Sequence, residues 1–348
     1  MVSIADLWVP SVWVAALQEA QATFPILFES GIVTRTPQMD TIATGAGTAV
    51  NIPFFKDITD QGDEIQVENT APVNDNGQTG DTMVATPLNR VTKNSAGALA
   101  AQVSGADPLQ AIIWALYARR LKQRQTTLLA QMRGLFGSAG AANAAAALSA
   151  VRLGGTTAEN FDENGLDATS DQLMSPDMFI DGKALMGELA DELKNGCLWV
   201  HPNIKARLEK LDSLNFRTLQ KPSDLPYDIT TYREIPIYTS SALVRAGTGN
   251  GFVYDTYLIA KGVVGYGEKA QKGDTIDVAS LSYFADKDKN NELVWDRTRF
   301  IMHMFGTKWI GTPGGQSATN AELQTPGNWS LVFQTANRVG AVCIRTNG

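Results

Sequence analysis

The chain has only two imidazoles, His201 and His303, and their surroundings limit the acid–base or metal chemistry it could perform. Neither lies in a His-Glu-x-x-His pattern, which would place two zinc ligands on one helical face, and no Gly-x-Ser-x-Gly turn offers a serine nucleophile. His201 precedes Pro202 at a predicted helix start, where a capping or structural role is the commoner one. We therefore expect no catalytic residue, no metal site and no cofactor. A soluble hydrolase that uses either histidine is a poor alternative.

Two further segments resemble reactive motifs but predict structure instead. Residues 247–251 read Gly-Thr-Gly-Asn-Gly, yet a strand follows them where a nucleotide-binding loop requires a helix, so they predict a turn. Cys197 and Cys343 lie in apolar, strand-like runs. This setting favours two small buried thiols over a redox pair or a disulfide framework.

Charged side chains form two clusters of opposite sign. Residues 56–81 hold seven acids against the single Lys56, a net charge of −6 within a chain total of −7. The acidic contact candidates are Asp57, Asp60, Asp63, Glu64 and Glu68. The basic contact candidates are Arg119, Arg120, Lys122 and Arg124. The basic cluster is either a solvated helix face or a surface that meets the acidic hairpin of a neighbouring copy or packaged DNA.

Composition limits the partners. A pI near 5.0 argues against a protein that grips nucleic acid along its whole surface, so any such contact should be weak and local. The longest uncharged run, residues 134–151, is rich in Ala, Gly, Ser and Asn and falls short of a membrane span. The first basic residue is Arg35, and no secretory signal is visible before it. We expect no membrane partner and a protein that stays in the cytosol where it is made.

The first ninety residues predict two extended segments. Residues 11–22 place Val12, Trp13, Ala16, Leu17 and Ala20 on one helical face, which is typical of an arm that docks on another surface. Residues 50–54 and 84–88 alternate at strand period around the acidic cluster and predict a long hairpin with an acidic tip. Pro53 and Pro87 suit edge strands. Because an isolated two-stranded ribbon is marginal in water, we expect another subunit to stabilise this hairpin.

The remaining 250 residues or so predict one long helix and a compact α+β unit, and a chain of 348 residues has room for about two domains. Asp107, Pro108 and Gln110 are helix-start signals, and apolar residues keep helical spacing to Phe136. From residue 175 helices are predicted over 183–194 and 202–211, with a strand over 197–200 between them. Strands over 235–239, 251–260 and 263–266 should complete that unit's sheet. Strands over 281–284 and 294–309 should return to the long helix.

The last third of the chain carries a family resemblance. The motifs, in order, are a polar turn over 283–291, the run Arg297 to Trp309, the blocks 319–323 and 328–333, and an apolar strand over 339–344. Residues 198–202 and 257–265 add to them. Together they resemble one family of tailed-phage major capsid proteins, by motif over roughly residues 175 to 348 and by layout elsewhere.

The resemblance implies an α+β fold of the Hong Kong 97 type. It would consist of an N-terminal arm (1–49), an extended loop (50–92), a peripheral domain (93–174) with a spine helix (107–136), an axial domain (175–275), and return strands with a C-terminal strand (276–348). Segments 1–49 and 50–92 cannot bury their apolar residues in one compact subunit, so we expect them to do so between subunits.

The resemblance also implies the function and the partners. Hundreds of copies would form hexameric and pentameric capsomers and close an icosahedral shell around double-stranded DNA, in the virion capsid and after assembly in the host cytoplasm. A separate scaffolding protein, a portal protein and a decoration protein are the other partners it suggests. The shell protein of a bacterial nanocompartment, which has the same fold, is the main alternative.

Overall fold

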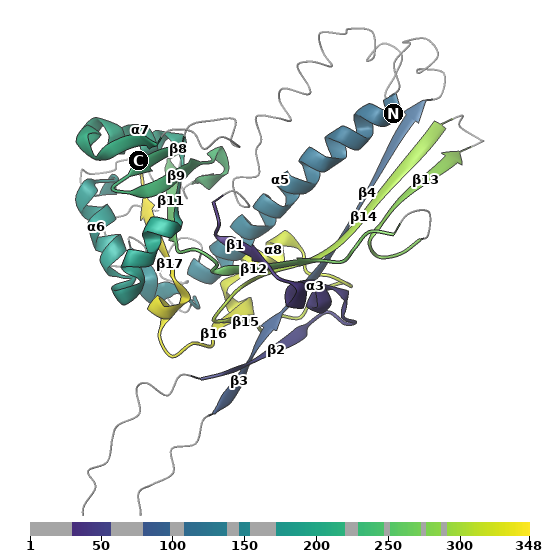
Figure 1. Ribbon diagram of the computed structural model, residues 1–348, viewed down its shortest axis with the longest axis horizontal. Coiled ribbons are helices and arrows are strands. Elements are labelled where there is room, and N and C mark those ends of the chain that lie inside the picture. Colours follow the sequence, from purple (N-terminus) through teal and green to yellow (C-terminus); the bar gives the residue numbers. More distant parts are fainter. Residues whose placement is uncertain are drawn as a thin grey trace, which may run out of the picture.

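Two β-sheets with one long helix between them form the framework of the described part of the protein in the computed structural model (Figure 1). The structure describes residues 30–56, 79–97, 108–137, 146–153, 172–219, 229–246, 251–272, 276–286 and 291–348. The predicted arm helix over 11–22, the tip of the hairpin and most of the turn over 247–251 lie outside these residues. The mixture of helices and sheets agrees with the predicted α+β class.

The long helix α5 (Pro108–Phe136) runs diagonally between the two sheets (Figure 1). In its second half, Leu128, Met132, Leu135 and Phe136 are all fully buried. Gly137 has a φ of 82°, a left-handed conformation that glycine adopts without a Cβ penalty, and it ends the helix. The predicted long helix is therefore confirmed.

A five-stranded sheet packs along α5. β14 (Asn291–Met304) pairs with β4 (Pro87–Gly97) along one edge, and with β13 (Ser280–Asp286) and β12 (Val264–Glu268) along the other. The short strand β1 (Val33–Arg35) pairs in parallel with β12. The ribbon of β4, β14 and β13 extends beside α5, as the predicted return strands require (Figure 1).

An eight-stranded sheet forms the compact unit at the other side of α5. Its order is β5 (Arg152–Leu153), β17 (Ala341–Thr346), β11 (Phe252–Ile259), β6 (Cys197–Val200), β9 (Ile235–Thr239), β8 (Ile229–Tyr232) and β7 (Phe216–Leu219), with β10 (Val244–Ala246) also on β11. α6 (Pro176–Ala184) and α7 (Pro202–Leu211) lie against this unit. Every residue of β17 is buried, which is why it can occupy an interior position in the sheet.

Two predictions for this unit are corrected. The strand predicted over 263–266 does not complete its sheet, because the chain turns at Gly262 and β12 joins the five-stranded sheet instead. The C-terminal strand β17 pairs with β11 in this sheet. The helix predicted over 183–194 is divided: α6 ends at Ala184, and a 3₁₀ helix (Gly187–Asn195) follows Gly187, whose φ is 59°.

Residues 30–49 form structure that the sequence did not predict. Thr36 caps α3 (Pro37–Thr44), and Pro37 occupies the first helical position. Met39 and Ala43 of α3 are buried with Ile301 of β14. The expectation that segment 1–49 buries its apolar residues only between subunits is therefore wrong for residues 30–49.

The hairpin is confirmed at its base. β2 (Val50–Phe55) pairs antiparallel with β3 (Gly80–Ala85), and this two-stranded ribbon extends away from the body of the subunit (Figure 1). Pro53 lies in the ribbon, and Pro87 begins β4, which pairs only with β14 among the described strands. Both prolines thus occupy edge strands, as predicted. The predicted second leg over 84–88 is corrected, because β3 ends at Ala85 and the residues from Pro87 onward pair with β14 in the five-stranded sheet.

A small module near the C-terminus packs under the end of α5. β15 (Thr307–Trp309) pairs with β16 (Trp329–Leu331), and α8 (Asn320–Gln324) begins with a capping box between Thr319 and Glu322. The Trp329 indole donates to the Leu323 carbonyl at 2.8 Å. The other 3₁₀ turns in the described residues are Ser149–Val151, Ser213–Asn215, Ser241–Leu243, Pro326–Asn328 and Ala336–Val339.

Candidate functional site

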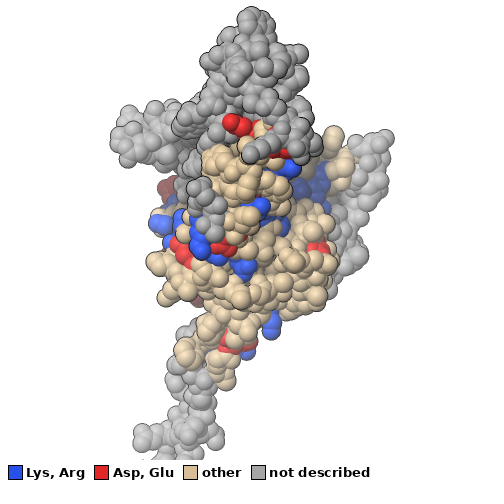
Figure 2. All heavy atoms as spheres, turned by 90° about the vertical axis from the view of Figure 1, so that its right-hand side faces the viewer, with Lys and Arg blue, Asp and Glu red and all other residues tan. Residues whose placement is uncertain are grey.

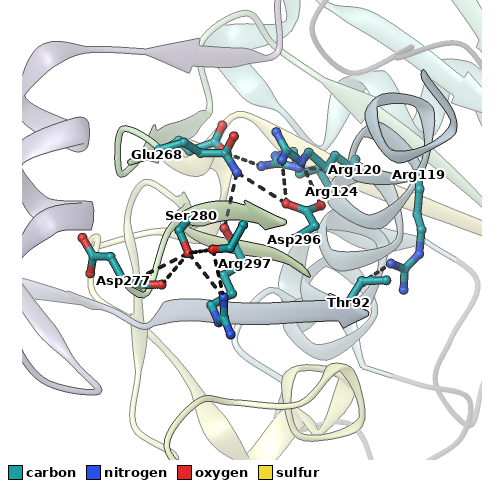
Figure 3. Close-up of polar contacts among 11 residues, drawn as sticks. Thr92, Arg119, Arg120, Arg124, Glu268, Asp277, Ser280, Asp296 and Arg297 are labelled. Carbon is teal, nitrogen blue, oxygen red and sulfur yellow. Dashed lines mark hydrogen bonds and ion pairs between the residues drawn. The ribbon is translucent and has the colours of Figure 1, made fainter. Parts of the chain in front are cut away.

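A layer of polar contacts joins α5 to the five-stranded sheet, and it contains most of the predicted basic cluster (Figure 3). Arg120 makes a two-point contact with Asp296 of β14, from Nε to Oδ2 at 3.0 Å and from Nη2 to Oδ1 at 2.5 Å. Asp296 is only 5% exposed. A paired arrangement of this kind fixes the helix on the strand because guanidinium and carboxylate match in two bonds.

Arg124 is one turn further along and is 3% exposed. Its Nε donates to the Tyr266 hydroxyl at 2.6 Å, its Nη2 contacts Glu268, and its guanidinium lies 4.9 Å from the centre of the Phe300 ring. Burial raises the pKa of Tyr266, so its hydroxyl stays protonated and donates in turn to Glu268 at 2.7 Å. Arg124 therefore acts inside the subunit.

The predicted basic surface is corrected for two of its four residues. Arg120 and Arg124 are turned toward Asp296 and Glu268 of the same chain, because burial of a guanidinium requires a local counter-charge. Arg119 and Lys122 lie on the exposed side of α5, and Arg119 contacts the Thr92 hydroxyl of β4 (Figure 3). These two are the cations of the cluster that remain at the surface.

The predicted acidic cluster is described only at its two ends. Asp57, Asp60, Asp63, Glu64 and Glu68 lie outside the described residues. Lys56 and Asp81 face each other across the ribbon at 3.1 Å, and both are partly exposed. Whether the cluster meets the basic residues of another copy stays a prediction.

A second charged cluster, which the sequence analysis missed, lies in the core of the eight-stranded unit. Asp255 of β11 is fully buried and contacts Arg345 of β17 at 2.8 Å and Arg245 of β10 at 2.9 Å, with Arg133 of α5 at 3.9 Å. Arg345 also donates to the Gly137 carbonyl at 2.6 Å, at the end of α5. A single acid within the apolar run 252–259 and a single arginine within 341–346 were the available signals.

Both histidines have structural positions. The ring of His201 accepts from the Asn203 amide at 3.2 Å and caps α7, as predicted. His303 is 1% exposed, and burial lowers its pKa to about 4.

Cys197 and Cys343 are buried free thiols, as predicted, and burial raises the pKa of each to about 12. Among the described residues, no group of His, Cys, Asp and Glu side chains could hold a metal ion. No helix in the described part of the chain is both long and apolar enough to cross a membrane.

Several large apolar side chains are exposed at the extremities of the subunit. Phe55 on the two-stranded ribbon is 74% exposed, and Leu214, in the turn after α7, is 91% exposed. On the face shown in Figure 2, basic side chains are interspersed with acidic ones instead of forming a single basic patch. Such a surface suits contacts with protein better than a continuous track for nucleic acid.

Comparisons with known proteins agree with this geometry. No family model matches the chain. The major capsid protein of Bacillus phage SPP1 is 22% identical over 336 residues, which are 95% of this chain and 94% of that protein. The cyanophage Pam1 capsid structure superposes with a TM-score of 0.55 at 13% identity and covers 91% of this chain and 88% of its own. The chain has the Hong Kong 97-type capsid fold.

A further structure supports the same assignment. The capsid of Ralstonia phage GP4 superposes with a TM-score of 0.54 at 9% identity and covers 92% of this chain and 90% of its own. The predicted fold class is thus confirmed. In the Hong Kong 97-type fold of this chain, α5 and the β2–β3 ribbon lie where the sequence predicts a spine helix and a hairpin. The predicted domain boundaries stay a prediction.

Proposed function

We propose that the chain is the major capsid protein of a tailed phage, and that its copies close an icosahedral shell around double-stranded DNA. The observation that carries the proposal is the similarity to the SPP1 major capsid protein, which extends over nearly the full length of both chains. A match confined to one domain would support only a shared fold. The full-length match supports a shared role.

The shape of the subunit supports self-assembly on physical grounds. The β2–β3 ribbon leaves the body of the subunit, and a lone two-stranded ribbon is marginally stable in water. Burial of Phe55 or Leu214 against another copy would stabilise the assembly by on the order of 2 kcal/mol per side chain. Both features are accounted for if other copies cover them in hexameric and pentameric capsomers.

The proposal also includes further partner proteins and a location for the protein. A scaffolding protein would guide assembly, a portal protein would occupy one vertex, and a decoration protein would bind the finished shell. The protein would reside in the virion capsid after assembly in the host cytoplasm. The division into arm (1–49), extended loop (50–92), peripheral (93–174), axial (175–275) and return segments (276–348) belongs to the same proposal.

We further propose that the acidic hairpin tip lies against the exposed cations of α5 in an adjacent subunit. Arg120 and Arg124 are committed to Asp296 and Glu268, so Arg119 and Lys122 are the residues of that helix available for the contact. The alternative arrangement directs these two cations toward packaged DNA.

The test of the main proposal is the assembly state of the purified full-length protein. Sedimentation and negative-stain microscopy should find capsomers or closed shells, and shells purified from a phage-producing host should contain DNA. A monodisperse monomer at every salt and crowding condition would refute self-assembly. Shells that hold a cargo enzyme and no DNA would instead identify a nanocompartment.

A further inference from the structure

The two outer edges of the five-stranded sheet differ in how they are protected against further strand pairing. β4 and β13 flank β14 in the extended ribbon, and β13 lies on the side of the ribbon away from α5 (Figure 1). A free edge presents backbone N–H and C=O groups that can pair with another strand, and natural sheets usually cover or charge such an edge. A comparison of the two edges therefore indicates where a partner strand could add.

The β4 edge is protected. The Asn89 amide donates to the Ser317 hydroxyl at 3.0 Å, and the Arg90 guanidinium donates to the Ala318 carbonyl at 2.8 Å, so the segment around Ser317 covers the beginning of this edge. Lys93 lies further along the strand and is exposed. A covering segment and an exposed lysine are both common devices against strand addition.

The β13 edge is covered only at its beginning among the described residues. The Lys272 amide donates to the Ala279 carbonyl at 2.9 Å, and the Leu281 amide donates to the Lys272 carbonyl at 3.4 Å. The backbone groups of alternate residues in a strand point to opposite edges, so Tyr283 and Ala285 direct their N–H and C=O groups to the same outer edge as Leu281. No described strand pairs with these two residues at that edge.

The side chains of β13 also suit a partner strand. Residues 278–285 form an uncharged run of eight. Tyr283 is 43% exposed and Phe284 is 41% exposed, and as consecutive residues of a strand they lie on opposite faces of the sheet. An added strand would therefore cover an aromatic ring on each face as well as the backbone groups at the edge.

We propose that β13 pairs antiparallel with β13 of a second copy, about a two-fold axis at Tyr283. An edge strand is complementary to itself in this arrangement, and two-fold symmetry is the commonest form of self-association. The Tyr283 residues of the two copies would exchange backbone hydrogen bonds, and Leu281 of each copy would lie opposite Ala285 of the other.

The uncharged edge favours a second copy over a charged partner. A segment rich in acidic or basic residues would find no opposite charge within residues 278–285, whereas two β13 strands match in length, hydrogen-bonding pattern and apolar character. Self-pairing through β4 would instead bring the Lys93 side chains of two copies near one another, and like charges across a strand pair are destabilising. The inference does not rest on the proposed capsid function, because it concerns a contact between two chains and not the shell.

Cysteine cross-linking in the full-length chain tests the position of the two-fold axis, since the native thiols of Cys197 and Cys343 are buried. The two Cα atoms at position 283 would lie about 5.5 Å apart, within the range of a disulfide. Oxidation of Tyr283→Cys, as free subunits and as any assembled particles, should give a covalent dimer on a non-reducing gel. Val91→Cys, at an exposed position of β4, is the matched control and should give at least about tenfold less dimer, because its Cα atoms would lie beyond disulfide range.

Mixed chains test the antiparallel direction. Leu281→Cys co-expressed with Ala285→Cys should give a disulfide that joins position 281 of one chain to position 285 of the other, as identified by mass spectrometry. Each variant alone should give at least about tenfold less dimer, because equal positions other than 283 lie apart in this register. A dimer that forms as readily from Leu281→Cys alone would indicate parallel pairing and would overturn the proposal.

Proline tests the contribution of the backbone. Ala285→Pro removes an amide that points to the outer edge and leaves the hydrogen bonds to β14 in place. It should lower the dimer yield of Tyr283→Cys at least about tenfold, whereas Ala285→Ser, which keeps the amide, should retain the yield. Circular dichroism of both variants checks that the subunit stays folded. An unchanged yield in folded Ala285→Pro, or no dimer from Tyr283→Cys in either preparation, would refute strand pairing at β13.

Discussion

Asp255 lies in the middle of β11 with arginines from three other elements around its carboxylate. Burial alone would raise the pKa of Asp255, but the charges of Arg245 and Arg345 outweigh it and hold the pKa below its usual value. The carboxylate therefore stays ionised in the folded state. Its stabilising contribution is present above the ordinary pKa of about 4 and is lost as the pH falls through the lowered folded value.

Asp255→Asn should lower the free energy of unfolding by about 3–5 kcal/mol, since removal of one partner leaves buried charges without compensation. Denaturant unfolding near neutral pH measures this difference. Asp181→Asn, which changes an exposed carboxylate on α6, is the matched control and should stay within about 0.5 kcal/mol of the parent. Equal effects of the two changes would show that the arginine cluster does not depend on Asp255.

His303 predicts a pH dependence of stability. Burial lowers its pKa in the folded state to about 4, while the unfolded chain has the ordinary value near 6.5. The unfolded state thus binds more protons between these values, and stability should fall as the pH drops from about 6.5 to 4, by about 3 kcal/mol in total.

His303→Gln should flatten this part of the profile while stability at pH 8 changes less. Free energies of unfolding, measured at pH 8, 6 and 4.5 for the parent and the variant, test whether His303 causes the loss of stability at low pH. A parent and a variant with the same slope between pH 6.5 and 4.5 would assign the acid sensitivity to other groups.

At the scale of elements, strong local signals in the sequence predicted individual helices and strands. The sequence did not predict which distant strands pair with one another. Pro108 and the helical spacing after it predicted α5, and Pro202 predicted the start of α7. The strand period around Val264 predicted β12 correctly but not its sheet, because membership depends on β1 and β14, which are distant in sequence. Gly265 and Gly267 indicated a close approach to this strand, and the sequence-based prediction did not use them. Because they lack a side chain, they allow Met39 of α3 to lie against β12.

The contact between α5 and the small C-terminal module depends on another glycine, Gly134. A Cβ at Gly134 would meet the Leu323 carbonyl and would lie 2.6 Å from the Trp329 indole nitrogen. Gly134→Ala should therefore destabilise the protein by about 1–3 kcal/mol through overpacking, although alanine favours a helix by about 1 kcal/mol.

Thermal unfolding of Gly134→Ala beside Gly327→Ala measures this effect. Gly327 has no heavy atom within 4 Å of the position that a Cβ would take, so its replacement controls for the loss of a glycine in the same module. A stabilised Gly134→Ala variant would mean that α5 and α8 separate more easily than the close contact implies.

At the scale of the whole molecule, the clusters of opposite charge were predictable but the use of each arginine was not. The sequence does not distinguish the four basic residues of the cluster, Arg119, Arg120, Lys122 and Arg124. The position of β12 and β14 against α5 determines which of them are buried. The helical angle of about 100° per residue places Arg119 and Lys122 on the opposite side from Arg120 and Arg124. Only the position of the sheet identifies the exposed side.

Charge reversal tests whether the exposed cations meet the acidic tip of a neighbouring copy. Asp63→Lys with Glu64→Lys should impair shell closure, and Arg119→Glu with Lys122→Glu in the same chain should partly restore it. Each exposed pair contributes only about 0–1 kcal/mol and is screened beyond about 8 Å at physiological salt, but this contribution is repeated in every copy of the shell.

Assembly of the parent should therefore weaken as salt rises, while the subunit stays folded because Arg120 and Arg124 keep their internal partners. Light scattering and microscopy measure closure. If the combined reversal restores nothing, while the helix changes alone reduce DNA retention, Arg119 and Lys122 face the packaged DNA instead.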